Sequence, residues 1–422
     1  MAYKQRIADA LLEHKLQGKG AILIEGPKWC GKTTTAKQIA KSVLDLGDSD
    51  VFNQSEQMIA LSASALLDGA TPRLIDEWQT LPALWDSIRT AVDKRADFAQ
   101  FILTGSAVPP EEKTRHSGTG RIGRLRMRPM SLWESGESDG RISLETLFNG
   151  EQIEVLHCEN DLNQLAFLTC RGGWPQATLL SGDFALDQAI DYYEAVTNTD
   201  IRRVDDVKRS PERARMFLRS YARNIASQTP YRTLRADMLQ HDSQTLNEDT
   251  VIDYADALRK IFVIEDSEAW NPNLRSKTAI RTSDTRYFVD PSIAAAALGI
   301  GPNDLINDLQ TFGLLFENLV VRDLRVYADA LNGKIYHYRD ANGLECDAVL
   351  HRRDGSYGLI EIKLGGTDNI ETGAATLNKL AANIDTNRMK APAFKMVVIG
   401  VGPYAYLRPD GVYVIPINLL KP

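Results

Sequence analysis

Eight consecutive residues near the amino terminus decide the fold: Gly26-Pro27-Lys28-Trp29-Cys30-Gly31-Lys32-Thr33. They follow the pattern G-x-x-x-x-G-K-T, which is typical of a loop that wraps a phosphate between a β-strand and an α-helix. The apolar run at residues 21–25 predicts that strand, and the residues from about 33 to 44 predict the helix. Backbone N–H groups at such a helix start attract anions. The stretch therefore predicts a nucleotide-binding loop in an α/β domain.

The residues of this loop have separate predicted tasks. Gly26 and Gly31 permit a tight turn and a close approach of the backbone to phosphate. Lys32 is expected to neutralise the β- and γ-phosphates of ATP, and the Thr33 hydroxyl to coordinate Mg²⁺. The other predicted nucleotide-binding positions are Pro27, Lys28, Trp29, Cys30 and Thr34. ATP and Mg²⁺ are thus the predicted cofactors.

Two adjacent carboxylates end the next apolar segment, Leu74-Ile75-Asp76-Glu77. A magnesium ion on a phosphate loop needs a carboxylate partner, and Asp76 lies at the strand end where such a ligand is expected. Glu77 is the predicted general base that orients and activates the attacking water. An exposed acidic turn would be the alternative if the loop before it were absent.

Hydroxyl and guanidinium groups extend the predicted site. Thr104 and Ser106 end the apolar segment at residues 101–106, where a hydroxyl can contact the γ-phosphate. Arg121 and Arg124 lie in a basic segment without acids at residues 109–128. They are candidates for stabilising transition-state charge, from the same chain or from a neighbouring one. The alternatives are a solvated basic loop or a patch for nucleic-acid phosphate.

A second constellation lies near the carboxyl terminus. Asp347 and, fourteen positions later, Glu361-Ile362-Lys363 fall on successive predicted strands, and Glu317 lies on the helix before them. Carboxylates at adjacent strand positions can hold Mg²⁺, while a lysine two residues on shares their strand face and can position a water. This is the chemistry of phosphodiester hydrolysis, although an exposed E-x-K is more often a solvated charge pair.

The composition sets the class of protein. The chain has 422 residues, a net charge of −7 and four cysteines without C-x-x-C spacing. Its length predicts two or three domains, and its acidity argues against a globally basic nucleic-acid binder. The cysteine pattern favours a reducing cytoplasm over a disulfide framework, and the sequence predicts no membrane span.

The chain order predicts four α/β and helical parts. Residues 1–135 are expected to form the nucleotide-binding core, and residues 136–226 a helical lid or connector. Two helices followed by a hairpin predict a winged helix within residues 227–300. Residues 301–422 are expected to form a separate α/β domain with Asp347 and Glu361 on its sheet.

Several motifs together resemble a bacterial and archaeal family of AAA-type ATPases with a C-terminal domain of unknown function, numbered 4143, related to PD-(D/E)XK nucleases. The likeness runs nearly from end to end. Besides the stretches already quoted, it is carried by Gly120-Arg121, Met130-Ser131-Leu132-Trp133-Glu134, Gly172-Gly173-Trp174-Pro175, Phe288-Val289-Asp290-Pro291 and Glu345-Cys346-Asp347.

The resemblance implies an AAA-type core, a helical lid, a winged-helix segment and a restriction-endonuclease-like end. It also implies that Arg121 or Arg124 is the arginine finger, and that subunits assemble into a homo-oligomer. Three hypotheses follow. ATP hydrolysis drives a conformational change in a protein that contacts DNA, or the protein is a nucleotide-dependent scaffold that binds other proteins, or it is an ATP-gated, metal-dependent nuclease. The many acids at residues 234–288 weaken the expectation of DNA binding there.

Overall fold

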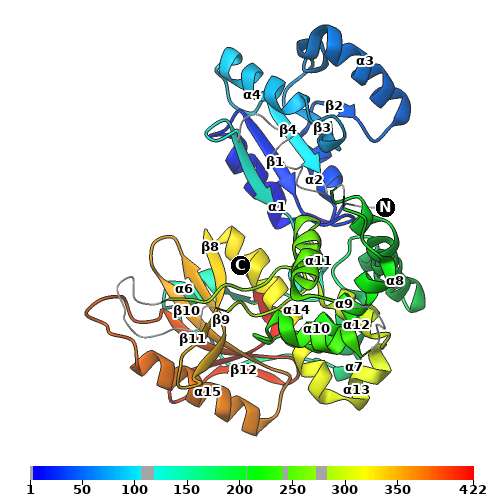
Figure 1. Ribbon diagram of the computed structural model, residues 1–422. Helices are drawn as coiled ribbons and strands as arrows, with labels where there is room; N and C mark the ends of the chain where they lie inside the picture. Colours follow the sequence, from blue (N-terminus) through cyan, green and yellow to red (C-terminus); the bar gives the residue numbers. More distant parts are fainter. Residues whose placement is uncertain (1–2, 106–117, 206, 241–245, 272–282) are drawn as a thin grey trace. The chain divides into compact units, whose positions relative to one another are not determined.

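The computed structural model describes residues 3–105, 118–205, 207–240, 246–271 and 283–422 (Figure 1). The chain divides into two compact units. The first comprises Met1–Pro129, Asp200–Lys208 and Ala257–Val263. The second comprises Met130–Thr199, Arg209–Asp256 and Ile264–Pro422.

The first unit is built on a parallel sheet of five strands in the order β2-β3-β4-β1-β5. The strands are β1 (Ala21–Glu25), β2 (Ser42–Asp45), β3 (Arg73–Asp76), β4 (Phe101–Gly105) and β5 (Ile122–Arg126). The central strands are apolar and buried along most of their length, as expected for a sheet covered on both faces. The predicted mixed α/β fold with a parallel sheet is confirmed.

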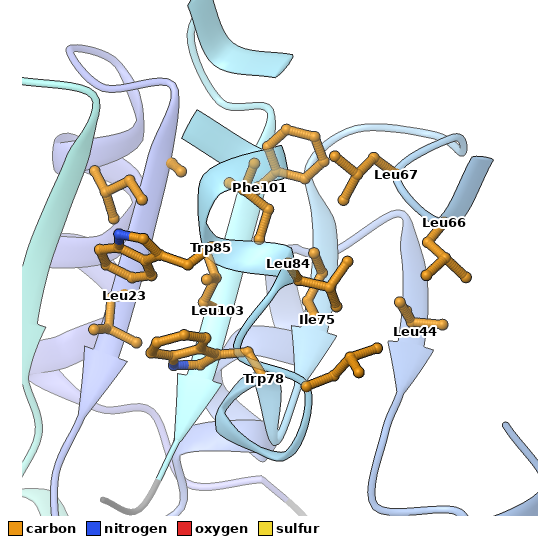
Figure 2. Packing of buried hydrophobic residues seen from close by; sticks show 14 of the residues in the cluster. Leu23, Leu44, Leu66, Leu67, Ile75, Trp78, Leu84, Trp85, Phe101 and Leu103 are labelled. Carbon is orange, nitrogen blue, oxygen red and sulfur yellow. The ribbon is translucent and has the colours of Figure 1, made fainter. Parts of the chain in front are cut away.

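The described residues of this unit also form four helices and two short 3-10 turns: α1 (Ile7–Leu16), α2 (Lys32–Ile39), α3 (Ser49–Leu66), η1 (Trp78–Thr80), α4 (Leu84–Arg95) and η4 (Asp200–Arg202). One buried cluster contains Trp78 and Trp85, whose rings lie 4.8 Å apart near Leu23 and Leu103 (Figure 2). A second buried cluster contains Leu12 of α1 and the strand residues that alternate along the chain with those of the first cluster. The two clusters fix the strand ends from which the functional loops start.

The helix predicted for residues 33–44 is too long. Helix α2 ends at Ile39, and residues 42–45 form the edge strand β2, which pairs in parallel with β3. The Lys41 N–H donates to the Pro72 carbonyl oxygen at 2.9 Å and begins this pairing. A short apolar stretch fits both helical and strand spacing. Pairing with β3 therefore determines that residues 42–45 form a strand.

The second unit contains a mixed sheet of seven strands in the order β7-β12-β13-β11-β10-β9-β8. Its strands are β7 (Leu156–His157), β8 (Gly333–Arg339), β9 (Glu345–Arg352), β10 (Tyr357–Lys363), β11 (Phe394–Ile399), β12 (Tyr404–Leu407) and β13 (Tyr413–Pro416). The two predicted strands that carry Asp347 and Glu361-Ile362-Lys363 are β9 and β10. Helix α14 (Leu309–Ala330) packs on β8, β9 and β10, and α15 (Thr367–Ala382) packs on β9, β10 and β11. A separate pair joins β6 (Ile142–Ser143) to β14 (Leu420–Lys421).

Residues 130–307 are mainly helical. The helices are α5 (Leu132–Ser135), α6 (Leu144–Phe148), α7 (Leu162–Arg171), η3 (Ala177–Leu179), α8 (Asp183–Asn198), α9 (Pro211–Arg223), α10 (Tyr231–Leu239), α11 (Glu248–Lys260), α12 (Pro291–Leu298) and α13 (Pro302–Asn307), and η5 (Ile417–Leu419) lies near the C-terminus. After α10 and α11, antiparallel bridges join Ile264 to Phe288 and Ser267 to Thr285. A winged helix at this place stays a prediction.

A buried charge network joins motifs that are far apart in the sequence of the second unit. The Arg322 guanidinium contacts the Asp290 carboxylate at 2.9 Å and the Asp323 carboxylate at 2.7 Å, and all three side chains are buried. Asp290 also accepts a hydrogen bond from the Gly173 N–H, and Asp323 accepts one from the Leu132 N–H. The motifs at residues 130–134, 172–175 and 288–291 therefore serve the packing of this unit.

The helices and the cysteines relate to two predictions from the whole sequence, which concern membrane spans and disulfide bonds. In the part of the chain that the structure describes, no helix has the length and apolar character needed to cross a membrane. The four cysteines are buried and none is in a disulfide bond.

Candidate active site

The loop between β1 and α2 has the geometry of a phosphate cradle. Gly31 adopts a left-handed φ of 98°, which a residue without a side chain adopts at low cost. A Cβ at Gly26 would lie 2.1 Å from the Met127 carbonyl oxygen, so only glycine fits that position. The N–H groups of the first turn of α2 face the same end of the sheet as the loop. Both glycines of the motif are thus required by the local structure.

Two side chains are held at the loop by its own backbone and by a strand end. The buried Lys32 ammonium donates to the carbonyl oxygens of Gly26 at 3.0 Å and Pro27 at 2.7 Å. The Thr33 hydroxyl donates to Asp76 Oδ1 at 2.9 Å, and the Thr104 hydroxyl donates to the same oxygen. The parallel register places Asp76 opposite Thr104, which explains their meeting. A hydroxyl and a carboxylate side by side are oxygen donors of the kind that Mg²⁺ takes.

Glu77 follows Asp76 immediately and turns the chain out of the sheet. Its φ of 53° and ψ of 40° are left-handed, an uncommon conformation for a residue with a side chain. The half-buried Glu77 carboxylate accepts a hydrogen bond from the Gln79 amide through Oε2. Strained backbone of this kind is frequent at functional sites. Asp76 and Glu77 thus lie at one sheet end but have different partners.

The loop is fastened to the rest of the first unit on both sides. The Lys28 ammonium contacts Asp200 at 2.6 Å, and the Arg6 guanidinium donates to the Cys30 carbonyl oxygen at 2.9 Å. Cys30 itself is buried, whereas the Trp29 side chain is 50% exposed. Of the predicted loop positions, Lys28 and Cys30 therefore help to hold the loop, and Trp29 is half exposed at its surface.

The outer members of the predicted site have different outcomes. Thr34 is exposed on the first turn of α2, next to Thr33. Ser106 lies outside the described residues. Whether these two residues bind the nucleotide stays a prediction.

The structure separates Arg121 from the loop of its own chain. Ala21 pairs with Ile122 and Glu25 with Arg126, so Arg121 lies at the amino end of the sheet, and the loop follows its carboxyl end. At about 3.3 Å per residue, five strand positions correspond to roughly 16 Å, beyond the reach of an arginine side chain. Arg121 instead contacts Asp93 at 2.8 Å. The hypothesis that Arg121 acts on the site of its own chain is therefore wrong.

Arg124 lies between these two ends of the sheet. It pairs with Leu23 in the register, and its guanidinium contacts the Glu25 carboxylate at 2.8 Å. Glu25 is the last residue of β1 before the loop, so Arg124 is closer to the loop than Arg121 is. Its role as an arginine finger stays a prediction.

The second unit brings the C-terminal constellation together. The Lys363 ammonium lies 2.7 Å from Glu361 Oε2 and 3.1 Å from Asp347 Oδ2. Asp347 Oδ2 also accepts a hydrogen bond from the Ile362 N–H at 2.8 Å, which ties β9 to β10. Glu317, on α14, accepts a hydrogen bond from the buried Tyr287 hydroxyl at 2.5 Å.

Burial and charge give these groups unusual proton affinities. Burial, with the charge of Asp347 adding to it, raises the pKa of Glu361 to about 8. Burial and the same aspartate raise the pKa of Glu317 well above its usual range. Burial alone would lower the pKa of Lys363, but Asp347 and Glu361 more than offset it and raise that pKa above its usual value. The lysine thus compensates part of the negative charge.

A metal ion at this second place is not favoured by the arrangement as it stands. Among the described residues, no three His, Cys, Asp or Glu side chains converge closely enough to hold one. The Lys363 ammonium lies between the two carboxylates that would be the ligands. Its displacement would be required before Asp347 and Glu361 could bind one metal together.

The motif analysis missed four contributors: Arg6, Gln79 and Asp200 near the loop, and Tyr287 near Glu317. Arg6 and Asp200 are distant in sequence from the residues they contact, and no spacing rule indicates them. Gln79 could have been found, since an amide two residues after the predicted base is close enough to contact it.

Comparison with known families agrees with the geometry of the first unit. The model of a family described as AAA domain matches residues 18–135. The chain carries an AAA domain and is an ATPase. The AAA domain starts shortly before β1 and includes the whole phosphate loop together with Asp76, Glu77 and Thr104. The C-terminal residues 312–420 match a domain of unknown function, DUF4143, and residues 162–304 match another, DUF8612.

Two relatives with a similar sequence are both described as uncharacterized proteins. Uncharacterized proteins of Mycobacterium bovis and Mycobacterium tuberculosis are each 24% identical over 379 residues, covering 88% of this chain and 76% of theirs. Among solved structures, the Walker-type ATPase paby2304 of Pyrococcus abyssi is 14% identical, with a TM-score of 0.40, covering 69% of this chain and 94% of its own. A variant of Thermotoga maritima RuvB is 17% identical, with a TM-score of 0.25, covering 62% and 86%.

Proposed function

We propose that the AAA domain hydrolyses ATP in the presence of Mg²⁺ and that Glu77 is the general base. The observation that carries this proposal is the contact of 2.9 Å between the Thr33 hydroxyl and Asp76. It brings a loop hydroxyl and a strand-end carboxylate, from residues 43 positions apart, onto one place beside the phosphate cradle. Both groups suit Mg²⁺, which would neutralise charge on the phosphates when bound.

The residues of the site would divide the work as follows. Lys32 would exchange its two loop carbonyl partners for phosphate oxygens, because a charged acceptor binds an ammonium more strongly than a neutral one. Thr33 and Asp76 would hold the metal. Glu77, one residue beyond the sheet, would orient a water and take its proton. Thr104, which now donates to Asp76, is close enough to the metal-binding pair to contact the γ-phosphate region.

Substitution of the base tests this assignment. Glu77→Gln keeps the shape of the side chain but removes its ability to accept a proton. We expect this variant to bind ATP with Mg²⁺ as the wild type does and to hydrolyse it about 10² times more slowly. Turnover and nucleotide affinity are measured separately on the purified full chain. Wild-type turnover in Glu77→Gln would show that another group is the base.

Assembly is a further part of the proposal. Because Arg121 does not reach the loop of its own chain, a role for it in hydrolysis requires a neighbouring subunit whose site it would enter. A homo-oligomer would supply that neighbour. Hydrolysis would then drive a conformational change in this protein, which would act on DNA or, as the alternative, bind another protein.

A second candidate function belongs to the C-terminal domain. The contacts of Lys363 with Glu361 and Asp347 support metal-dependent phosphodiester cleavage, since they place an ammonium and two carboxylates on adjacent strands. The same contacts also suit an inactive nuclease-like domain that serves as a protein-binding scaffold, because the ammonium occupies the space between the carboxylates. Both alternatives are compatible with an active AAA domain.

Cleavage assays separate these two alternatives. If the domain is a nuclease, DNA is cut in the presence of Mg²⁺ or Mn²⁺, and Lys363→Ala abolishes cutting while ATP hydrolysis is retained. Lys395→Ala, on the neighbouring strand β11, is the matched control and should cut as the wild type does. DNA that stays intact with both metals, with and without ATP, would remove the nuclease hypothesis and favour the scaffold.

A further inference from the structure

A polar side chain in the turn after β3 contacts the predicted base. The Gln79 amide donates a hydrogen bond to Glu77 Oε2, two residues before it in the chain. We propose that Gln79 is a positioning residue that holds the Glu77 carboxylate in the orientation needed to activate water. This inference rests on the proposed role of Glu77 in hydrolysis.

The turn that carries both residues is held in place by the packing of Trp78 and by a hydrogen bond from Thr80. Trp78, between them, is only 1% exposed, and its ring packs 4.8 Å from that of Trp85 in the apolar cluster of the first unit (Figure 2). The Thr80 hydroxyl donates to the Glu77 carbonyl oxygen at 2.8 Å and closes the turn. Because the backbone is held on both sides of Glu77, only the side-chain torsions of the glutamate are left to be set. The Gln79 amide sets them.

The Gln79 side chain buries an amide oxygen that has no hydrogen-bond partner in the described part of the chain, which packing alone does not explain. Its Oε1 is buried and has no hydrogen-bond partner among the described residues, and the same holds for the indole nitrogen of Trp78. Burying a polar atom without a hydrogen-bond partner destabilises the folded state. The amide hydrogen bond that Gln79 does make is the one to Glu77. The arrangement therefore serves the carboxylate more than the packing.

Gly105, at the end of β4, makes room for this amide. A Cβ built on Gly105 would lie 2.5 Å from Gln79 Oε1 and 3.2 Å from the Trp78 indole nitrogen. A methyl group there would move the end of the Gln79 side chain, because that end is flexible and the backbone of the strand is not. Gly105 is thus a second position from which the contact between Gln79 and Glu77 can be broken.

The chemistry explains why an amide suits this task. A carboxylate has two oxygens, and an N–H donor on Oε2 leaves Oε1 to accept a proton from water. Gln79 can orient the base but cannot replace it, since an amide does not take up a proton at neutral pH. Loss of Gln79 should therefore slow the chemical step and leave nucleotide binding unchanged.

The first test separates the rate of hydrolysis from binding. We expect Gln79→Ala to lower kcat about tenfold while KM and the affinity for a non-hydrolysable ATP analogue with Mg²⁺ stay at the wild-type values. Gln57→Ala, on the exposed surface of α3, is the matched control and should leave both unchanged. Gly105→Ala should reproduce the effect of Gln79→Ala. Wild-type kcat in Gln79→Ala would overturn the inference.

The second test asks whether Gln79 acts through Glu77. In single-turnover measurements, Gln79→Ala should lower the rate of ATP hydrolysis when Glu77 is present. In the Glu77→Gln background it should change that rate less than twofold, because the carboxylate that Gln79 orients is already absent. Effects that multiply would show that Gln79 acts independently and would overturn the inference. If Glu77→Gln itself turns over at the wild-type rate, the proposed base is wrong. If Glu77→Gln is slow but Gln79→Ala is not, only the positioning role is wrong.

Discussion

The pKa of Glu361 depends on the burial of its side chain and on two charged neighbours. Its side chain is 6% exposed, contacts the Lys363 ammonium at 2.7 Å and lies near the negative charge of Asp347. Burial disfavours the charged form of a carboxyl group, and a neighbouring negative charge disfavours it further. Both effects act against the attraction of the lysine, and the pKa of Glu361 is raised to about 8.

This raised pKa predicts a dependence of stability on pH. The unfolded chain releases the Glu361 proton near pH 4.3 and the folded protein near pH 8, so the folded state holds an extra proton between these values. The resulting stabilisation is complete at low pH and is lost as the pH rises through about 8. The slope is at most about 1.4 kcal/mol per pH unit. Lys363 is charged in both states over this range and adds no slope.

Glu361→Gln should remove that slope. Melting temperatures of wild type and variant, measured without divalent metal from pH 5 to 8.5, should shift in favour of the variant as the pH rises. A difference between the two that is constant over this range would contradict the raised pKa of Glu361.

For single residues, the sequence predicts the site residues that belong to a motif of fixed spacing. It does not predict residues that reach the site only through tertiary packing. The spacing of the loop motif and its place after a strand predicted Lys32 and Thr33, and the strand end predicted Asp76 beside them. Tyr287 could not be predicted, because its contact with Glu317 spans 30 residues and depends on how α14 packs. The position of Arg121 followed from strand register, which the composition of a basic segment does not contain.

At the scale of elements, the buried network around Arg322 orders the second unit. Asp290 is the N-cap of α12 and accepts a hydrogen bond from the turn after α7, whereas Asp323 lies within α14 and accepts one from the start of α5. Next to this network, Gly173 lies against the backbone of Met130, and the Met130 N–H donates to the Gly173 carbonyl oxygen at 2.6 Å. The glycine-rich turn is therefore a packing requirement.

Gly173→Ala should destabilise this unit. A Cβ at this position would lie 2.1 Å from the Met130 carbonyl oxygen, which is backbone and cannot move aside. We expect a loss of about 1–3 kcal/mol in thermal unfolding. Gly313→Ala is the control, because a Cβ there has no neighbour within 4 Å on helix α14, and it should stabilise by about 0.5–1 kcal/mol. Equal melting temperatures for the two variants would contradict this account.

Elements with long, regular patterns were predictable, and short ones were not. Strands β8, β9 and β10 extend over seven or eight residues, which is long enough to decide their type. Strand β2 has four residues and β7 has two, and each exists only because a partner strand lies beside it. Residues 136–226 were predicted as a helical lid or connector, but β6 and β7 lie within them and pair with β14 and β12 near the other end of the chain. Such pairing is a tertiary property.

At the scale of the whole molecule, the chain combines an AAA domain with a larger unit of unknown task. Because the net charge is −7, any contact with DNA would depend on a local basic patch. The two units do not follow one another along the chain, because Asp200–Lys208 and Ala257–Val263 belong to the first unit. Asp200, in the first of these segments, contacts Lys28 of the phosphate loop.

The most direct test of the account is a titration of the purified full chain with a fluorescent ATP analogue in the presence of Mg²⁺. We predict saturable binding to the wild type and an affinity at least about tenfold weaker for Lys32→Ala, since the loss of one charged hydrogen-bonding group costs about 1.5–3 kcal/mol. Absence of saturable binding to folded wild-type protein, or equal affinities of the two proteins, would contradict the assignment of the loop as the nucleotide site.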